Sequence, residues 1–147
     1  MNEAAASPAA GRLLLAPLRR YDDVALLLLR VMVGAFLLWG VADNIASTER
    51  MAEFEAFLAK FGFAAPALMA RLSVGAQFAV GLAFIAGFLT RWAGIVCMIN
   101  FIVAIVMVDA LGGIRASFPS ACLVGIGLYL ATHGAGRFGI DHLLHSR

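Results

Sequence analysis

The sequence predicts an all-α integral membrane protein, a four-helix bundle with a short amphipathic helix in the first external loop. Of its 147 residues 63% are hydrophobic and 14% are charged, whereas a soluble domain averages roughly 45–50% and about 25%. Between residues 72 and 108 the single charged side chain is Arg91. A chain this poor in polar residues cannot cover a water-soluble core, so lipid is the expected solvent.

Four apolar blocks are candidates for membrane spans, at residues 24–41, 72–89, 92–108 and 118–132. A helix of about 20 apolar residues crosses the hydrocarbon layer, and its backbone N–H and C=O groups are hydrogen-bonded within the helix. The blocks lack the alternation of a barrel strand. The fourth block is the shortest, and it would need Ser117 and His133 at the interfaces or a locally thinned bilayer.

The predicted organisation is a disordered cytoplasmic leader at residues 1–23 followed by one membrane domain at 24–144. Four spans place the N-terminus, the turn between spans two and three and the C-terminus on one side. Lys and Arg in short flanking segments favour the cytoplasmic side. Six basic residues on this side against four on the other predict that both termini are cytoplasmic; they are Arg12, Arg19, Arg20, Arg91, Arg137 and Arg147 against Arg50, Lys60, Arg71 and Arg115.

The loop after the first span has the periodicity of a short amphipathic helix. Ser47 is a suitable N-cap, and Gly62 followed by Pro66 can end the helix. Two arrangements remain open, a helix lying on the outer membrane surface and a loop helix packed on the spans. The apolar positions at helical spacing are Met51, Phe54, Phe57, Leu58 and Phe61.

Span two is predicted to be the central helix. Thr90 and Arg91 alone separate it from span three, so these two spans should be antiparallel neighbours. A stripe of small residues allows a neighbouring helix to approach closely, and a second line of small and polar residues occupies roughly the opposite side. The stripe is Gly75, Ala79, Ala83 and Gly87, and the second line is Ser73, Gln77 and Gly81.

Ionisable side chains inside a span need a partner or a function. Arg30 lies inside span one, where it can extend toward the headgroups near Asp22 and Asp23. Alternatively it binds an anionic headgroup, a quinone carbonyl or a carboxylate from another helix. At the outer end, Asp43 and Arg71 are at similar depth and are predicted to form an ion pair.

Gln77 and Asn100 lie in the middle half of the bilayer by their positions in spans two and three. Amides at this depth bond across helices or contact a ligand.

Cys97 and Cys122 should differ in depth by more than a disulfide can bridge. The histidines near the C-terminus match no zinc-binding pattern, nucleophile and phosphate motifs are absent, and a net charge of +2 gives no basic face for nucleic acid.

Several motifs, taken in order, resemble the DoxX family of small four-span bacterial membrane proteins. The first span has Leu28-Leu29-Arg30, Gly34, Phe36, Trp39-Gly40 and Asp43, and later segments are also similar: Phe61-Gly62-Phe63 with Pro66; Ala76-Gln77, Gly81, Gly87, Thr90 and Arg91; and Gly134-Ala135-Gly136-Arg137-Phe138-Gly139-Ile140-Asp141. Three positions depart from the family pattern. Trp39, Asp43 and Gln77 stand where His, Lys and Glu are common, so groups able to exchange protons are replaced at positions 39 and 77.

The resemblance implies a protein of the bacterial cytoplasmic membrane. It also implies an association with quinone-linked thiosulfate oxidation, as in some family members, or with membrane complexes that handle oxidative or thiol stress, as in others. We expect an accessory subunit, not catalytic on its own, that docks a quinone or a membrane or cytoplasmic oxidoreductase. The alternatives are a small transporter or lipid-binding protein and an assembly scaffold; a homo-oligomer is left open. No cofactor is firmly implied and no metal is expected. The candidate ligand residues are Arg30, Trp39, Asp43, Gln77 and Asn100.

Overall fold

The computed structural model describes residues 16–145, and this range is helical throughout apart from short connections. A 3₁₀ turn, η1 (Ala16–Tyr21), leads into α2 (Asp22–Ala46). Residues 16–23, which the sequence assigned to the leader, are therefore helical, and the rest of that segment lies outside the described residues. The remaining elements are α3 (Thr48–Lys60), α4 (Pro66–Ala86), α5 (Thr90–Met107), η2 (Asp109–Gly112), α6 (Ile114–His133) and α7 (Ile140–His145).

Within residues 16–145, four helices are long and apolar enough to cross a membrane, which confirms the four predicted spans. They are Pro17–Ala46, Pro66–Ala86, Thr90–Met107 and Ile114–His133. The fourth span is longer than its apolar block because the helix begins earlier, at Ile114, and includes Arg115 and Ser117. No local thinning of the bilayer is needed for a helix of this length.

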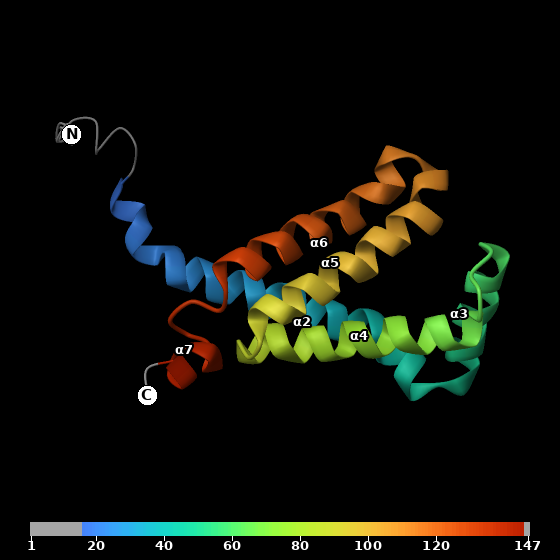
Figure 1. Ribbon diagram of the computed structural model, residues 1–147, viewed down its shortest axis with the longest axis horizontal. Helices are drawn as coiled ribbons and strands as arrows, with labels where there is room; N and C mark the ends of the chain where they lie inside the picture. The colour runs from blue at the N-terminus through green and yellow to red at the C-terminus, as the bar shows by residue number, and fades with distance from the viewer. Residues whose placement is uncertain (1–15, 146–147) are drawn as a thin grey trace.

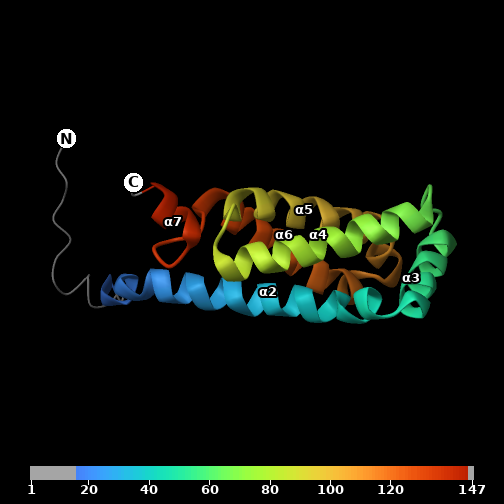
Figure 2. The same cartoon turned by 90° about the horizontal axis from the view of Figure 1, so that it is seen from below.

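The spans form two antiparallel pairs, α2 with α4 and α5 with α6, joined by contacts between α4 and α5. Figures 1 and 2 show the start of α2, the α4–α5 turn and α7 at one end of the molecule, with α3 at the other. We call these the termini end and the α3 end. Both described ends of the chain thus lie on one side, as the number of spans predicted, and α4 and α5 are the expected neighbours.

The helices approach most closely at glycines that the small-residue stripe did not include. A Cβ on Gly34 of α2 would lie 2.6 Å from the Gly81 carbonyl oxygen of α4, and one on Gly94 would lie 2.5 Å from the Gly127 oxygen. Gly75, in contrast, has open space where a side chain would be. Because the bundle separates into pairs, the Gly75 and Ala79 side of α4 is exposed, and the predicted stripe is wrong at these positions.

The turn between α4 and α5 comes three residues earlier than predicted. Gly87 (φ +66°) ends α4 and Leu89 (φ +49°) precedes α5, whose first residue is Thr90. The Asp141 carboxylate accepts hydrogen bonds from the backbone N–H groups of Leu89 (2.7 Å) and Thr90 (2.9 Å), and the Asp141 N–H donates to the Gly87 oxygen (2.9 Å). The segment before α7 therefore closes the turn.

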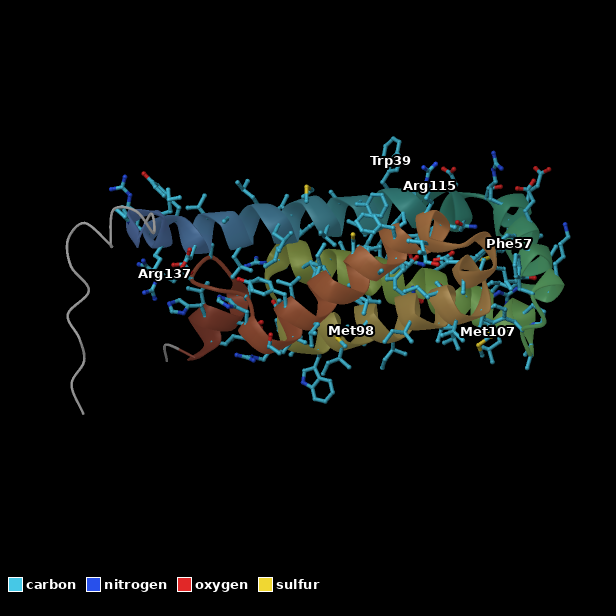
Figure 3. All side chains as sticks on the ribbon, turned by 90° about the horizontal axis from the view of Figure 1, so that it is seen from above. Trp39, Phe57, Met98, Met107, Arg115 and Arg137 are labelled. Atoms are coloured by element: carbon cyan, nitrogen blue, oxygen red, sulfur yellow. The ribbon has the colours of Figure 1, made fainter. Side chains whose placement is uncertain are left out.

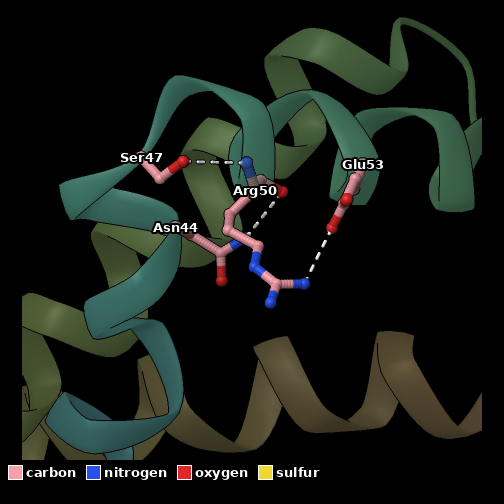
Figure 4. Close-up of polar contacts among 4 residues, drawn as sticks. All are labelled: Asn44, Ser47, Arg50 and Glu53. Carbon is pink, nitrogen blue, oxygen red and sulfur yellow. Dashed lines mark hydrogen bonds and ion pairs between the residues drawn. The ribbon is translucent and has the colours of Figure 1, made fainter.

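The predicted loop helix is confirmed as α3, which packs against α4 and α2. Figure 4 shows its start, where the Arg50 N–H donates to the Ser47 hydroxyl (3.3 Å) and the Asn44 amide donates to the Arg50 oxygen (3.2 Å). A serine at the N-cap satisfies one of the free donors of the first turn. Of the two arrangements left open, the structure has α3 packed on the spans.

Candidate functional site

A largely apolar pocket of about 520 Å³ lies at the α3 end, between α4 and α5. Figure 1 shows α5 diverging from α4 toward this end, while α3 crosses the end of the α2–α4 pair. The volume falls within the range of roughly 300–1,000 Å³ that is usual for small-molecule sites. Its walls are apolar side chains from three helices, among them Phe57, Leu58, Leu72, Ile99 and Phe101.

Two amides and a hydroxyl form a hydrogen-bonded polar strip on the pocket wall. The Gln77 amide nitrogen donates to Ser73 Oγ (3.2 Å), and Ser73 Oγ donates to Asn100 Oδ1 (2.9 Å). These side chains are half-buried and all three line the pocket. The contacts use one atom of each amide, so Asn100 Nδ2 and Gln77 Oε1 have no protein partner among the described residues. The wall therefore offers a neutral donor and a neutral acceptor.

Two aromatic rings of α3, Phe54 and Phe57, line the pocket, and Phe57 also contacts Phe61, which follows α3 and is not part of the pocket lining. The ring centroids of Phe54 and Phe57 are 6.3 Å apart, and those of Phe57 and Phe61 are 4.8 Å apart. These rings recur at the helical spacing that predicted α3, and Figure 3 places Phe57 at the α3 end. Near the other side of the pocket, Asp109 accepts a hydrogen bond from the Ser120 hydroxyl of α6.

Arg30 lies at the other end of the molecule, is fully buried and does not reach the headgroups near Asp22 and Asp23. Its guanidinium donates to the backbone oxygens of Phe84 (2.9 Å) and Ile85 (3.4 Å) at the end of α4. It also donates to Ala135 and to Phe138 (3.4 Å) before α7. The acceptors are carbonyls of its own chain, so the interpretation of an extended, headgroup-reaching arginine is wrong.

Trp39 and Asp43 do not join the pocket. The Trp39 side chain is 84% exposed and points away from the bundle in Figure 3. The predicted Asp43–Arg71 pair is not formed: Arg71 Nη2 lies 3.5 Å from Glu55 Oε1 on α3 instead. The prediction considered only the depth of each residue in the membrane. It could not show that α3 packs beside the start of α4 and brings Glu55 to Arg71.

The structure therefore brings together two of the five predicted ligand residues, Gln77 and Asn100. Ser73, which links them, was missed as a site residue, although its spacing of four from Gln77 places both on one helix face. Phe54 and Phe57 were predicted as part of the apolar face of the loop helix but not as lining of a pocket. Gly87 lies at the α4 end against the Arg30 guanidinium, and Ala83 packs against the core.

Cys97 and Cys122 are both free; Cys97 is buried and Cys122 is exposed. The Cys97 thiol lies 3.8 Å from the backbone oxygen of Leu123, the residue after Cys122. The two cysteines therefore lie at similar depth, and the predicted difference in depth is wrong, although no disulfide joins them. Within residues 16–145, no three His, Cys, Asp or Glu side chains lie close enough to hold a metal ion.

A family model described as DoxX matches residues 25–110. The chain belongs to the DoxX family. This match covers more than half of the sequence and includes α2, α3, α4 and α5, and hence every wall of the pocket. The similar segment at residues 134–141 lies beyond it. No curated protein and no solved structure matches the chain.

Proposed function

We propose that this DoxX protein is a non-catalytic accessory subunit of a membrane redox complex. In this role it binds a carbonyl-bearing apolar molecule, a quinone in the first instance, in the pocket between α3, α4 and α5. The observation that supports the proposal is a pocket with apolar walls and a free amide donor on Asn100. Ligand sites commonly combine apolar walls with a few polar groups that set orientation.

The donor set fits a carbonyl ligand. A quinone ring offers carbonyl acceptors, and the Asn100 amide nitrogen is the group that can donate to one of them. Neutral amides do not exchange protons near neutral pH. The two amides would therefore hold and orient such a ligand without exchanging protons, while Asp109, the carboxylate on the pocket wall, accepts the Ser120 hydroxyl.

The alternative of a transporter with a central cleft lined by Arg30, Gln77 and Asn100 receives no support. Arg30 bonds to carbonyls at the termini end, whereas the two amides lie in the pocket toward the α3 end. A lipid acyl chain remains an alternative occupant, because it needs only the apolar walls.

Binding of decylubiquinone to the detergent-purified full-length chain tests the proposal. We expect saturable binding by calorimetry, and Asn100→Leu should raise Kd about tenfold, since a lost hydrogen bond of about 1.4 kcal/mol corresponds to that factor. Thr132→Leu, an equally apolar replacement at the termini end, serves as the control and should leave Kd unchanged.

An unchanged Kd in Asn100→Leu would contradict the role of the amide and favour an acyl chain as occupant. The accessory role has its own test. Purification in mild detergent should retain an oxidoreductase, and recovery of the chain alone and free of quinone would count against it.

A further inference from the structure

A second pocket, of about 530 Å³, lies at the termini end and takes no part in the proposed quinone site. Three segments that are distant in the sequence form it: the start of α2, the start of α5 and the stretch from the end of α6 into α7. Its polar side chains come from each of them, including Asp23, Arg91, Arg137 and His142. Figure 3 places Arg137 at this end of the bundle.

Arg91 brings to this pocket a guanidinium whose hydrogen-bond acceptors are backbone oxygens. Its guanidinium donates to the backbone oxygens of Ala131 (3.2 Å), Thr132 (2.5 Å) and His133 (3.4 Å), where α6 ends. These acceptors are neutral. In the part of the chain that the structure describes, Arg91 forms no ion pair with a carboxylate.

Arg137 supplies a second guanidinium, which makes a long, exposed ion pair with Asp23. Its Nε lies 4.0 Å from Asp23 Oδ2, and its side chain is 76% exposed. The two carboxylates on the pocket wall already accept backbone N–H groups: Asp23 from Arg137 (3.1 Å) and Asp141 from Leu89 and Thr90. Two guanidinium groups and two carboxylates thus line one pocket, and each carboxylate also accepts backbone N–H groups.

The setting of the pocket favours a lipid over a soluble anion. Trp92 and Leu89 line it and are largely exposed, and tryptophan is enriched where a bilayer meets water. Basic pockets between transmembrane helices bind anionic headgroups, and guanidinium groups form strong charge-assisted bonds with phosphate. We propose that this pocket binds the phosphate of an anionic phospholipid, with the acyl chains lying along Leu89 and Trp92.

The fluorescence of Trp92 in full-length Trp39→Phe protein reports occupancy. In detergent, dioleoylphosphatidylglycerol should change the signal saturably and bind about tenfold more tightly than dioleoylphosphatidylcholine. Arg137→Gln should remove most of this preference. Arg115→Gln, at an exposed position near the α3 end, is the matched control and should keep it.

Arg91→Gln should also weaken binding, and circular dichroism checks its fold because Arg91 bonds to the end of α6. If that variant fails to fold, Arg137→Gln alone decides. Equal affinity for the two lipids, or unchanged preference in Arg137→Gln, would overturn the proposal. Saturation of the signal by inorganic phosphate at comparable affinity would overturn the assignment to a lipid.

Discussion

Arg30 shows how backbone carbonyls can accommodate a charge inside an apolar bundle. The last carbonyls of a helix have no partner within the helix and carry the negative end of its dipole. Arg30 of α2 satisfies two of them, on Phe84 and Ile85, and reaches two more before α7. One side chain therefore ties α2, the end of α4 and the C-terminal segment together.

Arg30→Met should destabilise the protein by about 3 kcal/mol, because it removes the donor and leaves several buried carbonyls unpaired. Denaturant titration in detergent micelles measures the free energy of unfolding. Arg50→Met is the control: Arg50 forms an exposed ion pair with Glu53 (3.0 Å), whose loss should cost less than about 1 kcal/mol. Equal stability of the two variants would contradict this role of Arg30.

At the scale of whole helices, two glycine crossings set the pairing. Gly34 meets Gly81 between α2 and α4, and Gly94 meets Gly127 between α5 and α6. Transmembrane helices gain little from the hydrophobic effect between themselves, so close backbone packing at small residues determines which helices associate. This packing within pairs leaves α4 and α5 free to diverge toward α3, where the apolar pocket lies.

Gly34→Ala should destabilise the α2–α4 pair by about 1–3 kcal/mol, because its methyl group would meet the Gly81 oxygen and the Ile85 side chain at less than 3 Å. Gly75→Ala offers a matched change on α4, where nothing lies within 4 Å. It should leave stability unchanged or raise it slightly, since alanine favours helix. Thermal unfolding in detergent compares them, and a larger loss in Gly75→Ala would refute the assignment.

The whole molecule is a multi-pass membrane protein whose surface is apolar along its length. Large side chains such as Leu28, Met32, Phe36 and Ile99 are exposed on the spans, as expected where lipid replaces water. Figure 2 shows the four spans running lengthwise, with the connections gathered at the two ends.

Cysteine labelling of intact cells and inverted vesicles tests the topology. In a variant lacking Cys97 and Cys122, Leu89→Cys at the α4–α5 turn should react with a membrane-impermeant maleimide from the cytoplasmic side, because the arginine distribution favours that side. Glu49→Cys on α3 should react from the opposite side. Labelling of both positions from one side would contradict the four-span arrangement.

The sequence by itself determined the fold class, the number of spans, the loop helix and the family. These follow from apolar runs, capping residues and motif order, which are local along the chain and need no knowledge of neighbours. Gln77 and Asn100 were also predictable as polar groups at mid-membrane depth. Ser47 was recognisable as a cap because capping involves residues only a few positions apart.

Only the tertiary structure decided which groups meet. Arg30 contacts carbonyls more than a hundred positions away, Arg71 pairs with Glu55, and Gly81, not Gly75, lies against a neighbouring helix. Such pairings depend on helix rotation and on where α3 and the C-terminal segment fold back. In an all-apolar span the hydrophobic pattern does not mark which face is inside, so side-chain fit between helices makes that choice.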